Sequence, residues 1–187
     1  MTIGIEDQPP ADDGRPGFRD RQTVTPAGDS VLPTIEGVVT HSPVVHLDHR
    51  GSLFEVYNGD PKMWTEPVVY AYQCSVLPGQ IKGWSRHEIK TDRYSLTVGG
   101  IMLLLHDGRP DSSTYATTQL VMLSSQGVRQ VVIPAGVWHL LVNLGSEEAH
   151  LMNFPTERYH HDAPDRILLP WDTDELPVDV KQYLPKF

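Results

Sequence analysis

The 187-residue chain has little cysteine, few basic residues and no long apolar run. Its single cysteine, Cys74, cannot form an internal disulfide, which favours a reducing compartment and predicts a cytoplasmic protein. Lysine and arginine total 15 against 24 acidic residues, and the formal net charge of -9 argues against nucleic-acid or membrane binding. No run approaches the roughly 20 apolar residues of a membrane span. The N-terminus also lacks the charged start and apolar stretch of a secretory signal.

The two ends of the chain differ in composition and in hydrophobic pattern from its middle. The first 33 residues are polar and lack apolar periodicity, so they cannot bury enough surface to offset the entropy lost on ordering. We therefore expect residues 1–33 to form a flexible N-terminal arm and residues 34–187 to form a single domain. Five prolines from residue 155 onward predict an irregular C-terminal tail packed over that domain, with one short helix near residues 178–183.

Between arm and tail, the chain consists of short β-rich runs separated by turn residues such as Asn58-Gly59-Asp60 and Pro78-Gly79. The runs occupy residues 38–40, 44–47, 52–57, 68–77, 93–105, 119–123, 130–133, 138–144 and 150–154. No long helical periodicity accompanies them. Many short strands separated at regular intervals by turn residues predict an all-β sandwich or barrel.

Two segments carry residues suited to chemistry. The first contains Gly79, Ser85, His87, Asp92 and Gly99. Five, one, four and six residues separate them in that order. The second reads P-A-G-V-W-H from residue 134 to His139 and ends at Asn143. Alternate residues of a strand face the same side, so Ser85 and His87 are expected to point together into the barrel. If His139 enters from an opposing strand, the two imidazoles converge with the carboxylate of Asp92.

These segments resemble the two motifs of the cupin superfamily, G-x5-H-x-H-x3–4-E-x6-G followed by P-x-G-x2-H-x3-N. The second motif is matched throughout, whereas Ser85 stands in place of the first histidine and Asp92 in place of the glutamate. The resemblance implies a cupin-type double-stranded β-helix, or jelly roll, with a central cavity.

Five stretches are similar to motifs of one enzyme family within that superfamily. They read D-H-R-G-S-L-F-E (48–55), G-Q-I-K-G-W-S (79–85), D-S-S-T-Y (111–115), I-P-A-G-V-W-H (133–139) and, within 167–180, W-D and L-P-V-D. Together they resemble the dTDP-4-dehydrorhamnose 3,5-epimerase family over roughly residues 37–180. The resemblance implies an isomerase of deoxysugar biosynthesis that removes a proton alpha to the carbonyl of a nucleotide-linked 4-keto-6-deoxysugar or similar ketone, without a cofactor. It also implies a homodimer that exchanges N-terminal strands near residues 37–47.

Several functions of that family fall on different side chains here. Its basic histidine falls at Ser85, its enolate-stabilising lysine at or near Asp92, and its acidic tyrosine at or near Met152 or Asn153. A serine hydroxyl cannot act as a base unaided. We therefore predict that His87 takes over as the catalytic base, with Asp92 orienting it and His139 beside it.

The substrate contacts are expected at positions that the family uses for its nucleotide sugar. The resemblance makes Arg50 the phosphate contact, and a guanidinium suits a bidentate bond to a diphosphate. Tyr70 and Tyr72 stand where the family has nucleotide contacts, and they supply a phenolic acid or a stacking face. The full predicted substrate-binding set is Arg50, Glu55, Tyr70, Tyr72, Lys82 and Ser85.

Two other functions are compatible with the same residues. In the first, His87, Asp92 and His139 form a two-His-one-carboxylate site for a divalent Fe, Mn or Ni ion in a metal-dependent cupin enzyme. In the second, the chain is a non-catalytic sugar-nucleotide binder, since three catalytic positions of the family are altered. Bound metal, hydrogen exchange into a ketosugar, and ligand binding without turnover distinguish the three functions.

Overall fold

The computed structural model describes residues 22–28 and 30–184 of the chain. Of the expected N-terminal arm, residues 1–21 and residue 29 lie outside this range. The remainder of the arm contains an isolated bridge between Val24 and Ser30. None of the helical segments in the described part of the chain has the length and apolar character needed to cross a membrane.

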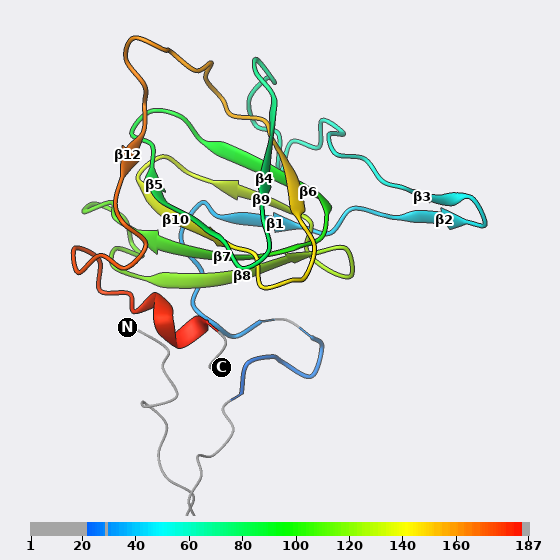
Figure 1. Cartoon of the computed structure of the whole chain (residues 1–187), viewed down its shortest axis with the longest axis horizontal. Helices are drawn as coiled ribbons and strands as arrows, with labels where there is room; N and C mark the ends of the chain where they lie inside the picture. Colours follow the sequence, from blue (N-terminus) through cyan, green and yellow to red (C-terminus); the bar gives the residue numbers. More distant parts are fainter. Residues whose placement is uncertain (1–21, 29, 185–187) are drawn as a thin grey trace, which may run out of the picture.

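Two five-stranded antiparallel sheets form the body of the molecule (Figure 1). The first sheet contains, in spatial order, β1 (Val39–His41), β9 (Gln130–Ile133), β6 (Asp92–Val98), β11 (Ala149–Asn153) and β4 (Tyr72–Val76). The second contains β12 (Ile167–Leu168), β5 (Ile81–Arg86), β10 (Val137–Val142), β7 (Gly100–Asp107) and β8 (Thr118–Ser124). From β4 onward the chain passes repeatedly from one sheet to the other, as it does in a jelly roll. The all-β prediction is confirmed.

The apolar residues of β7 alternate between two hydrophobic cores. Ile101, Leu103 and Leu105 pack between the two sheets. Met102 and Leu104 face the other way and pack with apolar side chains of the C-terminal tail. A strand buried on both faces reads as a continuous apolar run, which is why residues 101–105 show no polar alternation. The tail is therefore part of the packed structure, as its composition predicted.

Two segments extend beyond this sandwich (Figure 1). A hairpin of β2 (His46–Asp48) and β3 (Gly51–Leu53) projects away from the sheets, and all of its residues are exposed. The tail crosses the second sheet as irregular chain, pairs briefly through β12 and ends in the 3₁₀ helix η2 (Val180–Tyr183). That helix lies within the region where the sequence predicted a short helix.

The structure corrects three strand boundaries. Residues 93–105 do not form one strand, because the chain turns at Gly99, whose φ of +78° is costly for other residues, and passes from β6 to β7. Strand β5 lies outside every predicted run, since its sequence I-K-G-W-S-R lacks β-branched alternation. The run at residues 68–77 becomes a strand only from Tyr72 onward.

Candidate active site

A cavity of about 750 Å³ opens between the two sheets and the tail. Its volume lies in the range of roughly 300–1,000 Å³ that is usual for small-molecule sites. Strands β4, β5, β6, β10 and β11 line it, and tail residues around 166–169 close one side. The polar side chains at its wall include those of the first sequence motif. The predicted central cavity of a jelly roll is therefore present.

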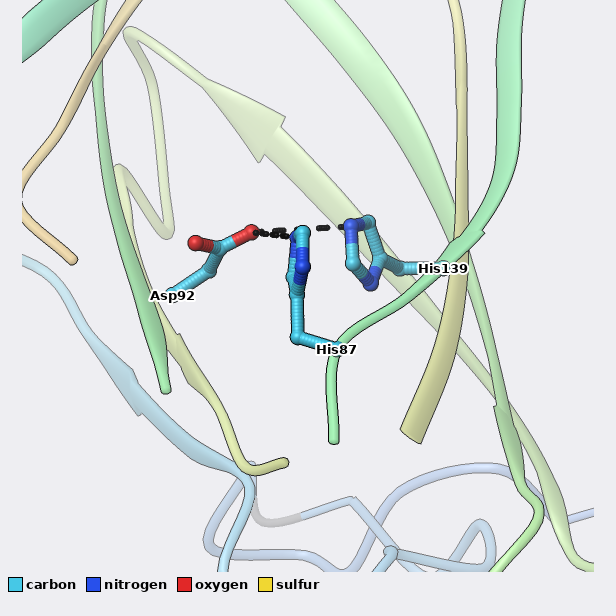
Figure 2. A group of neighbouring side chains, drawn as sticks. All are labelled: His87, Asp92 and His139. Carbon is cyan, nitrogen blue, oxygen red and sulfur yellow. Dashed lines mark ion pairs between the residues drawn. The ribbon is translucent and has the colours of Figure 1, made fainter. Parts of the chain in front are cut away.

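His87, Asp92 and His139 meet at the wall of this cavity (Figure 2). Asp92 begins β6, His87 directly follows β5, and His139 lies in the middle of β10. The Nε2 atoms of His87 and His139 lie 3.2 and 3.6 Å from Oδ2 of Asp92. The structure thus brings the three residues together, but His139 comes from the strand next to β5, opposite Ser85, rather than from a facing one.

The carboxylate of Asp92 is ionised although its side chain is only 1% exposed. Burial alone would raise its pKa, but the hydrogen bond from His87 and the nearby histidines lower it well below the usual range. Asn153 Nδ2 donates to Oδ1 at 2.9 Å, and the Tyr94 hydroxyl donates to Oδ2 at 3.1 Å. A fixed negative charge therefore lies beside both imidazoles.

His139 is held in its neutral form. Burial lowers its pKa from 6.5 to about 4, and the attraction of Asp92 only partly offsets this effect. Its Nδ1 lies 3.3 Å from the carbonyl oxygen of Val137, which can only accept a hydrogen bond. The proton of the neutral ring is therefore on Nδ1, and the lone pair of Nε2 points toward Asp92.

His87 is oriented from the tail. Its Nδ1 contacts the backbone carbonyl oxygen of Asp165, so this nitrogen also carries a proton. The Asp165 carboxylate accepts the backbone N–H groups of Glu88, Ile89 and Lys90 at 2.8 to 3.1 Å. One tail residue thus fixes both the ring of His87 and the loop that follows it.

Nε2 of His87 and Nε2 of His139 consequently converge on one carboxylate oxygen of Asp92. A cation within such a cluster, either a proton on one imidazole or a metal ion, stabilises it. The ligating atoms of the three side chains all lie within 4.8 Å of one another. The site is therefore arranged to receive a positive charge at Nε2 of His87.

Two tyrosines carry phenolic protons at the cavity. Burial and the charge of Asp92 raise the pKa of Tyr72 to about 12, and its hydroxyl accepts a hydrogen bond from Asn153 at 2.8 Å. The same two causes raise the pKa of Tyr94 well above its usual value. Both phenols stay protonated near neutral pH. The ring of Tyr70 lies 5.8 Å from that of Tyr72, and both rings are about one-third exposed.

The predicted substrate contacts divide into two groups. Tyr70, Tyr72, Lys82 and Ser85 line the cavity, and Lys82 Nζ lies 3.9 Å from Sγ of Cys74. Arg50 and Glu55 do not line it within this chain. Arg50 lies at the tip of the β2–β3 hairpin, where it pairs with Asp48 at 2.6 Å.

Sequence reasoning missed several residues of the cavity. Tyr94 was detectable, because it lies two residues after Asp92 on β6 and therefore faces the same side. Lys90, Tyr159 and Arg166 at the cavity gave no such signal, nor did Asp165, which contacts His87, since they come from a loop and from the irregular tail. The guanidinium of Arg166 donates to Oγ of Ser85 at 3.4 Å, which links the tail to β5.

The comparison with known proteins agrees with this geometry. The family model described as dTDP-4-dehydrorhamnose 3,5-epimerase matches residues 33–185. The chain belongs to this family. The prediction of an epimerase-type isomerase with a cupin fold is thereby confirmed.

Two relatives share 30% of the aligned residues with this chain. The probable low-salt glycan biosynthesis epimerase Agl13 of Haloferax volcanii is 30% identical over 142 residues, which are 75% of this chain and 91% of that protein. The spore coat polysaccharide biosynthesis protein SpsL of Bacillus subtilis is 30% identical over 142 residues, 76% of this chain and 93% of SpsL.

Solved structures of the family share the fold. The crystal structure of a dTDP sugar isomerase from Desulfovibrio desulfuricans G20 superposes with a TM-score of 0.72 and 24% identity, covering 78% of this chain and 91% of that one. The structure of ChmJ, a 3'-monoepimerase from Streptomyces bikiniensis, in complex with dTDP-quinovose gives a TM-score of 0.67 at 21% identity. The match covers 79% of this chain and 76% of ChmJ. The jelly-roll prediction is therefore confirmed.

Proposed function

We propose that the chain epimerises a nucleotide-linked 4-keto-6-deoxysugar, or a similar ketone, in the deoxysugar biosynthesis of the cytoplasm. The observation that carries this proposal is the buried His87–Asp92 pair, whose Nε2 is placed to hold a transferred proton next to a fixed carboxylate. The names of related proteins, among them a dTDP-4-dehydro-6-deoxyglucose 3-epimerase from Streptomyces, support the substrate class.

Nε2 of His87 is the base in the first step. The carbonyl oxygen of Asp165 keeps a proton on Nδ1, so Nε2 is the nitrogen that exchanges its proton, and it acts as the base once it has released the proton that it shares with Asp92. When Nε2 takes the proton alpha to the ketone, the electron pair of the C–H bond moves onto the ketone oxygen and forms an enolate. The new N–H then donates to Asp92, 3.2 Å away. The carboxylate stabilises the imidazolium only once it has formed, as a catalytic group should.

A phenol returns the proton. Tyr72 lines the same cavity, and its hydroxyl hydrogen is free to donate because Asn153 supplies the hydrogen bond that its oxygen accepts. The enolate carbon takes the phenolic proton from the face opposite His87 and so inverts its configuration. Burial and the charge of Asp92 hold the pKa of Tyr72 high, which keeps the phenol protonated until that step.

We propose Tyr70 as a stacking face for the substrate and Lys82 and Ser85 as polar contacts, without a metal cofactor. Arg50 and Glu55 would reach a cavity only across a homodimer, and the exposed β2–β3 hairpin supports this arrangement. Val44, Leu47 and Leu53 on and beside the hairpin are 73%, 79% and 63% exposed, which suits burial against a second copy.

The test is hydrogen exchange in deuterated buffer. The purified protein is incubated with dTDP-4-keto-6-deoxyglucose, and deuterium uptake at C3 and C5 is followed by NMR. We expect uptake that disappears in His87→Ala and persists in His150→Ala, a partly exposed histidine of β11 outside the cavity. Uptake at one carbon identifies a mono-epimerase. Uptake unchanged in His87→Ala would refute the base assignment, and no uptake by the native chain would refute the substrate class.

One observation favours a second function, that of a metal-dependent cupin enzyme. Both histidines direct Nδ1 to a backbone carbonyl, the arrangement that aims Nε2 of a ligating histidine at a metal ion. The donor set of His87, Asp92 and His139 fits Fe(II), Mn(II) or Ni(II), which would supply Lewis-acid or redox chemistry. Elemental analysis of the purified protein tests this function. Stoichiometric metal together with loss of activity in EDTA supports it, and activity in metal-free protein contradicts it.

A further inference from the structure

Asn153 connects the proposed acid with the proposed base from behind the cavity wall. It is the last residue of β11, it is fully buried, and it pairs with Tyr72 of β4. Its Nδ2 donates to the Tyr72 hydroxyl at 2.8 Å and to Oδ1 of Asp92 at 2.9 Å. Its Oδ1 accepts the backbone N–H of Arg93 at 3.1 Å. One amide thus contacts both the phenol and the carboxylate that is the partner of His87.

These three contacts assign the orientation of the amide. With the amide reversed, its oxygen would face the carboxylate of Asp92 and its nitrogen would face the N–H of Arg93. Both contacts are unfavourable, because a carboxylate has no proton to donate and an N–H has no lone pair to accept one. The group that faces Tyr72 is therefore an N–H donor, which cannot accept a hydrogen bond.

The direction of this hydrogen bond decides where the phenolic hydrogen of Tyr72 lies. Because the oxygen accepts from Asn153, the hydrogen points away from the amide and is available to a substrate in the cavity that Tyr72 lines. A water molecule or an oxygen atom in place of the amide nitrogen would accept that hydrogen and hold it behind the wall. The N–H of Asn153 also stabilises the phenolate that remains once the proton has left.

Resting on the proposed epimerisation, we propose that Asn153 is a positioning residue that commits the enolate to inversion. If the imidazolium of His87 returns its proton, the electron pair of the enolate forms the C–H bond on the original face and the substrate is regenerated. If Tyr72 gives its proton, the same pair forms the bond on the opposite face, and the electron pair of the O–H bond stays on the phenolate oxygen. By turning the phenolic hydrogen toward the substrate, Asn153 favours the second outcome. The phenolate then regains a proton from water, and His87 releases its own.

Asn153→Asp tests this inference, because it keeps the shape of the side chain and reverses the hydrogen bond to Tyr72. Two adjoining carboxyl groups do not both ionise, so the new group shares one proton with Asp92, still accepts from Arg93 and now also accepts from the phenol. Native and variant proteins are incubated with dTDP-4-keto-6-deoxyglucose in deuterated buffer, and NMR measures the epimer formed and the deuterium in the recovered substrate. We expect the ratio of epimer to deuterated substrate to fall roughly tenfold or more in the variant. KM is expected to change less than about threefold, since Asn153 contacts the acid rather than the substrate.

The ratio separates positioning from a structural role, because a general loss of structure lowers both quantities together. Asn153→Ala leaves room for a water molecule that accepts from Tyr72, so its ratio should also fall. Tyr72→Phe removes the acid, so deuterated substrate should form almost without epimer. The control is Asn143→Asp, at a fully buried asparagine whose amide donates to the carbonyl oxygens of Val76 and Glu147. It should lower the melting temperature and keep the native ratio.

Each failure has a different meaning. A ratio within about threefold of native in both Asn153 variants, whatever their total rate, would overturn the inference alone. A native ratio in Tyr72→Phe would refute Tyr72 as the acid and this inference with it. Absence of exchange in the native chain would overturn the proposed substrate class and, with it, the inference.

Discussion

Acidification from pH 7 to pH 4 tests the electrostatic state of the buried His139. Burial lowers the pKa of this side chain from 6.5 to about 4 in the folded protein. The unfolded chain regains the ordinary value. Between these two pH values the unfolded state binds a proton on His139 that the folded state does not, so the free energy of unfolding falls as the pH falls.

The size of the effect follows from the shift. One pKa unit corresponds to about 1.4 kcal/mol, so lowering the pKa from 6.5 to about 4 removes about 3 kcal/mol of stability by pH 4. At pH 7.5 and above the contribution is nearly constant, because the ring is almost entirely neutral in both states. The lowered pKa of Asp92 acts in the same direction, but only below its ordinary value of 3.8.

The assay is chemical denaturation of the native chain and of His139→Gln at half-unit steps from pH 7.5 to pH 4. Buried His106, whose pKa is also lowered by desolvation, contributes equally to both proteins and cancels in their difference. We expect the stability advantage of native over variant to shrink by about 3 kcal/mol across this range. A difference that stays within about 0.5 kcal/mol at every pH would show that His139 is not held neutral.

Three further changes test the scaffold of the site. In Gly83→Ala, a Cβ at φ +122° would lie 2.6 Å from the carbonyl oxygen of His139. We expect a loss of about 3 kcal/mol and a melting temperature lower by roughly 6–12 °C in calorimetry, and unchanged melting would contradict this. Asp107→Asn removes the charge of a fully buried carboxylate that accepts hydrogen bonds from the Arg109 guanidinium at 2.8 Å. We expect the free energy of unfolding in urea titration to fall by about 2 kcal/mol, and a urea midpoint equal to that of the native chain would refute this. Asp165→Ala frees the loop backbone at residues 88–90, so exchange should slow by roughly 10- to 100-fold with circular dichroism unchanged, whereas native exchange rates would show that the loop needs no such anchor.

The fold was predictable because its signals are local. Turn residues separate the strands, and the continuous apolar run of β7 marks a strand buried on both faces. Strand β5 was not among the predicted β-rich runs, although Ser85 and His87 were expected on one strand, because Lys82 and Gly83 have low β-propensity and the strand forms through its pairing with β10. Pairing with β10 therefore determines that residues 81–86 form a strand, which their own β-propensity does not.

The site was predictable to the extent that it lies on regular strands. The spacing of the two motifs predicted that His87, Asp92 and His139 converge only if His139 entered from an opposing strand, whereas it lies on β10, which pairs with β5. The contacts of Asp165 span 75 to 78 residues, and no periodicity in an irregular tail indicates such a pairing. Lys90 was missed for a related reason, because a loop side chain has no face that alternation can assign.

The dependence of His87 on Asp165 links activity to the order in which the chain is synthesised. A nascent polypeptide that ends at residue 160 already contains every strand except β12. It lacks the carbonyl oxygen that fixes the ring of His87 and the carboxylate that holds the following loop. We therefore expect proton transfer by His87 to be acquired only once the tail has docked. Removal of the tail by a protease would take away this anchor together with β12 and the apolar side chains that cover the second sheet.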